Sequence, residues 1–155
     1  MTAVVDALNN VTRYQYDPVG NLLVHTDANG HSTRFDVDLL GRTKKETNPE
    51  SCVWSYQFDP MGNRTERVDA NGAHTGYTFD ADDRLTEIRY PDGARVTLDY
   101  DENDNLTALR DTSGRATFVY DALNRLSESA RTEKILNGKL LKYEYDKVGN
   151  RKKVI

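Results

Sequence analysis

The sequence has few of the features that stabilise small secreted domains or mark membrane spans. It contains one cysteine among 155 residues, Cys52, which cannot form an internal disulfide, so the fold does not depend on an oxidising compartment. No apolar run reaches 18 residues, and residues 1–10 lack the basic and apolar regions of a signal peptide. The sequence therefore predicts neither a disulfide framework nor a membrane span, and no signal peptide within this chain.

The chain is also poor in apolar residues and has no excess of positive charge. Hydrophobic residues make up 37% of it and charged residues 30%, with a net charge of −4. This composition is too polar for a thick two-layer core, so aromatic side chains must supply most of the apolar burial. The negative charge argues against a nucleic-acid partner, because binding to phosphates requires clustered basic side chains.

What the chain does have is a repeat in which an aspartate anchors each copy. Successive anchors are 21 residues apart four times, and then 20 and 25 residues apart. A fixed period in this range is typical of repeat architectures. The anchors are Asp17, Asp38, Asp59, Asp80, Asp101, Asp121 and Asp146.

Nearly all aromatic residues occupy two slots, one and three residues before an anchor. Polar residues alternate with them, as in residues 13–16, and this period of two predicts half-buried strands with the rings on one face. Rings on neighbouring strands would form a ladder, with roughly 0.2–1 kcal/mol for each cross-strand pair. The predicted ladder comprises Tyr14, Tyr16, Phe35, Tyr56, Phe58, Tyr77, Phe79, Tyr100, Phe118, Tyr120, Tyr143 and Tyr145.

Two turns complete each copy. One follows the anchor, as in residues 17–21, and the other is rich in Asn-Gly or Asp-Gly, as in residues 27–30. Aspartate can bond its own backbone two residues on, and glycine tolerates positive φ, so we interpret the anchors as turn residues. The predicted turn glycines are Gly20, Gly30, Gly41, Gly62, Gly72, Gly93, Gly114, Gly138 and Gly149.

Two copies are irregular in length. A one-residue deletion before Asp121 is expected between Gly114 and Phe118, and four extra residues are expected between Ser127 and Leu136. A slip elsewhere would turn the following side chains to the opposite face of the sheet.

Residues 1–155 are therefore interpreted as one all-β array of about seven tandem hairpins. Its approximately fourteen short strands would form a long, curved antiparallel sheet, stabilised by contacts between sequence neighbours. The chain begins and ends within a copy, so we expect it to be a fragment of a longer array. The two exposed sheet edges would pair with adjoining repeats or with a second copy.

The strings YQYDPVGNL, FDPMGNR, YDALNRL and YEYDKVGNR, with TDANG turns between them, resemble the Rhs or YD repeats. These repeats occur in bacterial Rhs polymorphic toxins, in the C component of insecticidal Tc toxin complexes and in teneurins. The resemblance implies a spiralling β-sheet that is a section of a hollow shell. In the bacterial members this shell encloses a C-terminal toxin, so the implied partners are adjoining repeats and an encapsulated toxin domain. It also implies a bacterial protein that is secreted or delivered by a non-classical or secretion-system route.

The chain departs from this family at the self-cleavage region. The family ends its shell with a DPxGL-type core, but Asn21 and Asn63 stand where that leucine would be, so no processing site is assigned. Size sets a further limit, because about fourteen strands would close into a ring roughly 21 Å across. A 100-residue domain is more than about 30 Å across, so this chain alone could form only one section of a wall.

Catalysis is the least favoured interpretation of the recurring polar residues. Seven anchors followed by turn residues fit backbone capping better than acid–base pairs. His25, His31 and His74 are scattered, and Cys52 has no histidine at a recognisable spacing. The acidic loops lack the order of known calcium sites. We therefore expect no enzyme activity, no catalytic residue, no metal site and no cofactor.

The principal alternative is an extended binding surface for a glycan or a partner protein. Tyrosine-rich strips can stack on sugars, and repeat arrays commonly present long interaction surfaces. Trp54 and Tyr90 lie outside the two aromatic slots and are the candidate binding residues. Packing against Tyr56 and Phe58 is the competing interpretation of Trp54.

Overall fold

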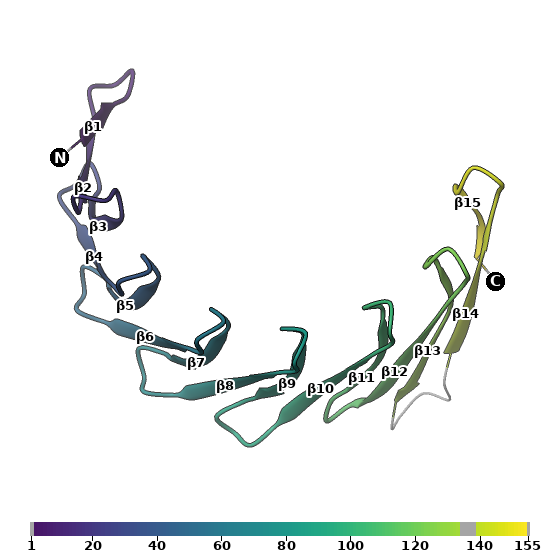
Figure 1. Cartoon of the computed structure of the whole chain (residues 1–155). Coiled ribbons are helices and arrows are strands. Elements are labelled where there is room, and N and C mark those ends of the chain that lie inside the picture. The colour runs from purple at the N-terminus through teal and green to yellow at the C-terminus, as the bar shows by residue number, and fades with distance from the viewer. Residues whose placement is uncertain (1, 134–138, 155) are drawn as a thin grey trace. The chain divides into compact units, whose positions relative to one another are not determined.

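The computed structural model describes residues 2–133 and 139–154, and every regular element in them is a β-strand (Figure 1). The strands are β1 Thr2–Val5, β2 Val11–Tyr16, β3 Leu22–Thr26, β4 Ser32–Val37, β5 Thr43–Thr47, β6 Val53–Phe58, β7 Arg64–Val68, β8 His74–Phe79, β9 Leu85–Arg89, β10 Arg95–Tyr100, β11 Leu106–Arg110, β12 Gly114–Tyr120, β13 Leu126–Glu133, β14 Lys139–Tyr145 and β15 Arg151–Val154.

The strands form one sheet in chain order, from β1 to β15, without closing on itself. Neighbouring strands are antiparallel, as in the pairing of β2 with β3 and of β4 with β5. The predicted all-β fold of tandem hairpins is therefore confirmed. One more strand is present than expected, because Thr2–Val5 pairs with β2 ahead of the first anchor. The chain divides into two compact units, Met1–Thr75 and Gly76–Ile155, each of them a run of hairpins.

Each hairpin whose turn begins at an anchor contains a β-bulge. The register shifts just before the residue that precedes the anchor, for example between Gln15 and Tyr16 and between Asp99 and Tyr100. The extra residue lies on the second strand, where Thr107 donates its hydroxyl to the carbonyl of Asp99 at 3.1 Å. Thr86 and Ser127 make the equivalent bond in their own hairpins. A bulge of this kind increases the local twist of a strand pair.

The sheet is a single layer with almost no fully buried side chain. Among the residues that the structure describes, Ala108 is the buried hydrophobic residue, at 2% exposure. The rings of both aromatic slots are half-buried, except that Tyr16 is 46% exposed. The aromatic side chains therefore contribute partial burial at many positions instead of one closed core.

The irregular copies differ from the rest at their turns. In most turns the first N–H bonds the carbonyl four residues on, but Asp111 bonds Gly114, three residues on, at 2.9 Å. The deletion therefore lies within the turn that ends at Gly114, and the expectation of a shortening between Gly114 and Phe118 was wrong. A loop absorbs a missing residue without moving the register of the strand that follows. The extra residues of the last copy lengthen β13 to eight residues, and Gly138 lies outside the described residues.

Candidate functional site

The anchor turns form a regular row of hydrogen-bonded loops along the sequence. The N–H of Asp17 donates to the carbonyl of Asn21 at 2.9 Å, and the N–H of Gly20 donates to the carbonyl of Asp17 at 3.2 Å. Oδ1 of Asp17 accepts from the N–H groups of Val19 and Asn21. Oδ1 likewise accepts the N–H four residues on at Asp38, Asp59, Asp80, Asp101, Asp121 and Asp146. The anchor carboxylates thus satisfy backbone donors of the loop that they begin.

One residue in each anchor turn adopts a left-handed conformation. It stands three residues after the anchor, with φ of 97° at Gly20 and 77° at Gly41. Asp83, Asp104 and Asn124 occupy the same position with φ between 58° and 65°. Aspartate and asparagine tolerate this region better than other residues with a Cβ, which explains which residue types replace glycine here.

The second turns use the same chemistry as the anchor turns. Asp27 and Asp69 begin such turns, and each accepts two backbone N–H groups at Oδ1. Asn48 and Tyr90 occupy the same turn position. Tyr90 is therefore the first residue of a turn, with its side chain 41% exposed. These aspartates were not predicted as anchors, although each stands three residues before a glycine, as Asp17 and Asp59 do.

The side chain four positions after each anchor binds that anchor's carboxylate, and in several repeats it also contacts the next hairpin. Arginine and asparagine alternate there, and we call these seven the connector residues: Asn21, Arg42, Asn63, Arg84, Asn105, Arg125 and Asn150. Each arginine binds its own anchor, with Nε to Oδ2 distances of 2.7, 2.8 and 2.7 Å. This set was not predicted from the sequence, although the alternation is visible there.

The arginine connectors also bind the following hairpin. Arg84 donates from Nη1 to the carbonyl of Asp101 at 3.1 Å and to Oδ1 of Asp104 at 2.7 Å. Its Cζ lies 5.1 Å from the ring centroid of Tyr100. Arg42 makes equivalent contacts with its following hairpin. Its Nη1 donates to the carbonyl of Asp59 at 3.2 Å, and its Cζ lies 4.6 Å from the centroid of the Phe58 ring. One side chain thus combines an ion pair, a cation–π contact and a backbone bond across two repeats.

The asparagine connectors make shorter links. Asn105 donates from Nδ2 to Oδ2 of Asp101 and to Oδ1 of Asn124, both at 3.0 Å. A Cβ placed on Gly41 would lie 2.5 Å from Oδ1 of Asn21. An asparagine connector therefore reaches the turn of the next repeat without crossing an aromatic ring.

The predicted ladder residues lie on the strands before the anchors, where several contact groups other than rings. Tyr100, Tyr120 and Tyr145 donate their hydroxyls to the carbonyls of Leu85, Leu106 and Leu126, at 2.9, 3.0 and 2.8 Å. Tyr14 and Tyr16 stack within one strand, with centroids 6.4 Å apart. In four hairpins the aromatic residue nearest the anchor thus contacts the preceding hairpin through a hydroxyl bond or an arginine: Phe58, Tyr100, Tyr120 and Tyr145.

The anchor carboxylates are held in their ionised form. The side-chain amide of Asn21 lowers the pKa of Asp17, and the guanidinium groups of Arg42 and Arg125 lower the pKa values of Asp38 and Asp121. At Asp59 partial desolvation opposes the shift, but hydrogen bonds from Asn63 and its neighbours still lower the pKa. A carboxylate that accepts several donors is stabilised in its charged form.

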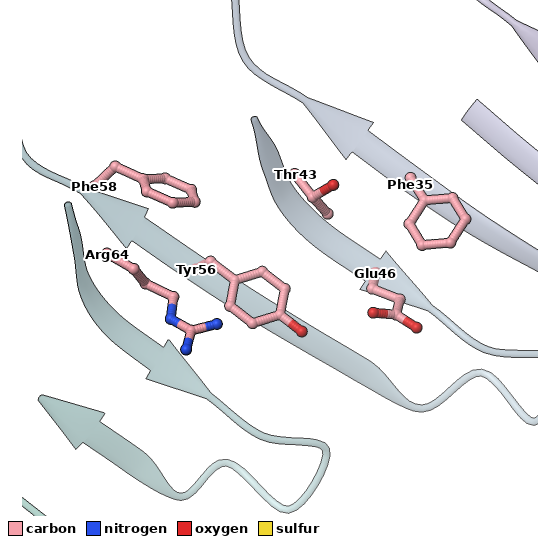
Figure 2. Close-up of a pocket in the computed structure, with 6 residues that line it drawn as sticks. All are labelled: Phe35, Thr43, Glu46, Tyr56, Phe58 and Arg64. Atoms are coloured by element: carbon pink, nitrogen blue, oxygen red, sulfur yellow. The ribbon is translucent and has the colours of Figure 1, made fainter. Parts of the chain in front are cut away.

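An open hollow of about 370 Å³ lies on the aromatic face of β4–β7 (Figure 2). Tyr56 stands at its centre and directs its hydroxyl to the side of Glu46 (Figure 2). The lining residues are Phe35, Thr43, Glu46, Tyr56, Phe58 and Arg64. Trp54 is half-buried on β6, directly opposite Glu46 in the strand register.

Two of the histidines considered as site residues each lie beside one carboxylate. His31 approaches Asp27 at 3.3 Å, and His74 approaches Glu66 at 2.8 Å. Cys52 is half-buried with a free thiol. In the described parts of the chain, no three His, Cys, Asp or Glu side chains group as a metal site would require. Residues 2–133 and 139–154 contain no helix that is long and apolar enough to cross a membrane.

Strands in chain order, turns closed by aspartate and connectors between successive turns define a β-hairpin repeat protein. The RHS repeat family model matches residues 1–35, 37–74, 65–96 and 100–134, so the chain belongs to the RHS repeat family. No curated protein sequence matches the chain.

The fold is shared with solved Tc toxin structures. A crystal structure of TcdB2-TccC3-Cdc42 is 22% identical with a TM-score of 0.79 and covers 93% of this chain. TcdB2-TccC3-TEV matches at 21% identity, a TM-score of 0.78 and 93% coverage. The Tc holotoxin pore of Photorhabdus luminescens with a TccC3 mutation matches at 21% identity, with a TM-score of 0.78 and coverage of 94% of this chain. The chain spans about 9% of the length of these structures. The resemblance to the Rhs shell fold is thereby confirmed.

Proposed function

We propose that the chain is a non-catalytic segment of an Rhs-type β-shell that encapsulates and sequesters a C-terminal toxin or effector before delivery. The segment would form one section of the wall, within a single array of repeats that extends beyond these 155 residues. Its partners would be adjoining repeats and the enclosed polypeptide. The protein would be secreted or delivered from a bacterium by a non-classical or secretion-system route.

The observation that supports this proposal most directly is the hairpin sheet that follows chain order, together with its likeness to the TccC3-containing structures over 93% of the chain. Such a sheet grows by adding hairpins at its ends, since every strand pairs with its sequence neighbours. The connector residues fit this role, because they bind their own anchors and several of them, such as Arg42, Arg84 and Asn105, also bind the next hairpin.

Limited proteolysis of the full open reading frame that contains this segment tests the proposal. We expect a distinct downstream polypeptide, identified by mass spectrometry, to survive until the repeats are unfolded with urea. The same downstream polypeptide expressed alone is the control and should be digested rapidly. Rapid loss of the downstream part while the repeats stay intact would contradict a sequestering shell.

A second candidate function is an extended surface that binds a glycan or a partner protein. The open hollow with half-buried Phe35, Tyr56 and Phe58 rings favours it. Trp54 is the single tryptophan and lies beside this hollow, so its fluorescence should change when a suitable polysaccharide is added. An unchanged spectrum across a panel of polysaccharides would remove the glycan candidate.

A further inference from the structure

Glu46 is the one acidic residue of the row in which it lies. Its strand partner is Phe35, which occupies the aromatic slot three residues before an anchor. The residues in the same register of the other hairpins are His25, Arg67, Ile88, Leu109, Ser129 and Val154. A carboxylate therefore occurs once among the seven residues at this position.

Aromatic residues flank this carboxylate on both neighbouring strands. Phe35 on β4 and Trp54 on β6 are its direct cross-strand partners, which places their Cβ atoms about 4.5–5.5 Å from that of Glu46. Tyr56 lies on the same face, two residues beyond Trp54, and both Glu46 and Tyr56 line the hollow (Figure 2).

The carboxylate of Glu46 forms no direct ion pair within the part of the chain that the structure describes. Its neighbour Lys45 approaches Asp36 instead, at 3.9 Å. Arg64 lines the same hollow, and its Cζ lies over the Tyr56 ring, 5.6 Å from the ring centroid. A half-buried carboxylate between aromatic rings loses hydration without forming an ion pair, so a bound cation would stabilise it.

We infer that this hollow binds a protonated amine of the lysine type, presented by a polypeptide. The Glu46 carboxylate would supply the counter-charge, and the face of the Phe35 ring would supply cation–π attraction, since Arg64 already lies over the Tyr56 ring. The hydroxyls of Thr43 and Tyr56 line the same hollow and can accept hydrogen bonds from an ammonium group. A neutral sugar could stack on the rings, but it would leave the charge of Glu46 uncompensated. The site is independent of the proposed shell role.

Fluorescence of Trp54, the single tryptophan of the chain, can test the site directly. The probe is Nα-acetyl-lysine amide, and its uncharged analogue is Nα-acetyl-norleucine amide. We expect a saturable change with the lysine probe that weakens as salt is added, because salt screens the charge. The norleucine probe should bind about tenfold more weakly or not at all. Equal binding of the two probes, or binding indifferent to salt, would overturn the inference.

Paired variants assign the effect to Glu46. Glu46→Gln keeps the shape and removes the charge, so we expect affinity for the lysine probe to fall about tenfold. Glu50→Gln makes the same change of net charge at an exposed turn residue and should leave affinity within about twofold. Thermal unfolding confirms that both variants are folded, and the salt dependence of the wild-type protein tests the site if one is not. Unchanged lysine binding in Glu46→Gln would overturn the site, and saccharide binding that survives this change would assign the hollow to glycans.

Discussion

At the scale of single residues, the connector arginines make more distinct interactions than other side chains described above. Arg84 combines an ion pair with Asp80, a second with Asp104, a bond to the carbonyl of Asp101 and a contact with the Tyr100 ring. Lysine could not make this set, because a single ammonium group lacks the planar guanidinium fork. Arg84 is 24% exposed, so solvent screens these contacts only in part.

Replacing this connector should destabilise the protein measurably. We expect Arg84→Gln to lower the free energy of unfolding by about 2 kcal/mol, since it removes charge-assisted hydrogen bonds and a cation–π contact. Urea denaturation measures the change. Arg115→Gln, at an exposed strand position, is the charge-matched control and should cost less than about 0.5 kcal/mol. Similar losses in the two variants would mean that connectors contribute no more than ordinary surface arginines.

The aromatic rings should contribute less individually than rings of a closed core. Full truncation of a buried aromatic residue costs about 3–5 kcal/mol, but Tyr56 is only half-buried. We therefore expect Tyr56→Ala to cost about 1–2 kcal/mol in urea denaturation. Tyr90→Ala, at an exposed turn residue, should cost less than about 0.5 kcal/mol. A loss above about 3 kcal/mol for Tyr56 would show that its ring is buried in solution.

At the scale of the hairpin, the anchor turn requires a left-handed residue at its fourth position. Gly20 has φ of 97°, and a Cβ placed on it would meet no atom within 4 Å. Gly20→Ala should therefore cost about 1–2 kcal/mol through backbone strain alone. Gly20→Asn should cost less, because asparagine already occupies the equivalent position at residue 124. Thermal or urea unfolding of the two variants gives the comparison, and an asparagine variant as unstable as the alanine one would refute it.

Much of this hairpin could be predicted from the sequence, because its determinants are local. Alternation before Asp17 predicts a strand, and Pro18 and Gly20 predict the turn that follows. The bulge at Thr107 could not be predicted in this way, since alternation along β10 continues unchanged up to Tyr100 and the extra residue lies on the partner strand. Its pairing depends on the register of two strands and not on the pattern of either.

The connectors were missed for a different reason. Arg42 and Asn63 occupy the same position but differ in size and charge, so a search for one residue type at a fixed spacing does not group them. Their function depends on a neighbour 17 residues further along, the carbonyl of Asp59 in the case of Arg42. The hollow around Glu46 was also missed, because cross-strand pairing of Phe35, Glu46 and Trp54 brings together residues that no single motif contains.

At the scale of the whole molecule, the row of ionised aspartates should make the free energy of unfolding depend on pH. Hydrogen bonds from Asn21 and Arg42 lower the pKa values of Asp17 and Asp38, and the other anchors are shifted in the same direction. A carboxylate with a lowered pKa stabilises the folded state above the unfolded value of about 3.9. That contribution is lost as pH falls through the lower, folded-state pKa.

We therefore expect the free energy of unfolding to be nearly constant from neutral pH to about pH 5 and to fall steeply below about pH 4. Urea denaturation at a series of pH values measures this profile. Asp38→Asn should lower stability at neutral pH and reduce the loss on acidification, because one titrating group has been removed. A flat profile down to about pH 3 would show that the anchor hydrogen bonds do not favour the charged form in solution.

The order of the strands has a consequence for synthesis. Because every strand pairs with the strand before it, no segment must wait for a distant partner, and contacts of this local kind form rapidly. The chain can add each hairpin to the growing sheet as it leaves the ribosome, since segments fold from the N-terminus onward during translation. If a longer array of the same design encloses a downstream polypeptide, as proposed above, that polypeptide would emerge after the sheet is in place, so the order of translation would form the enclosing wall first.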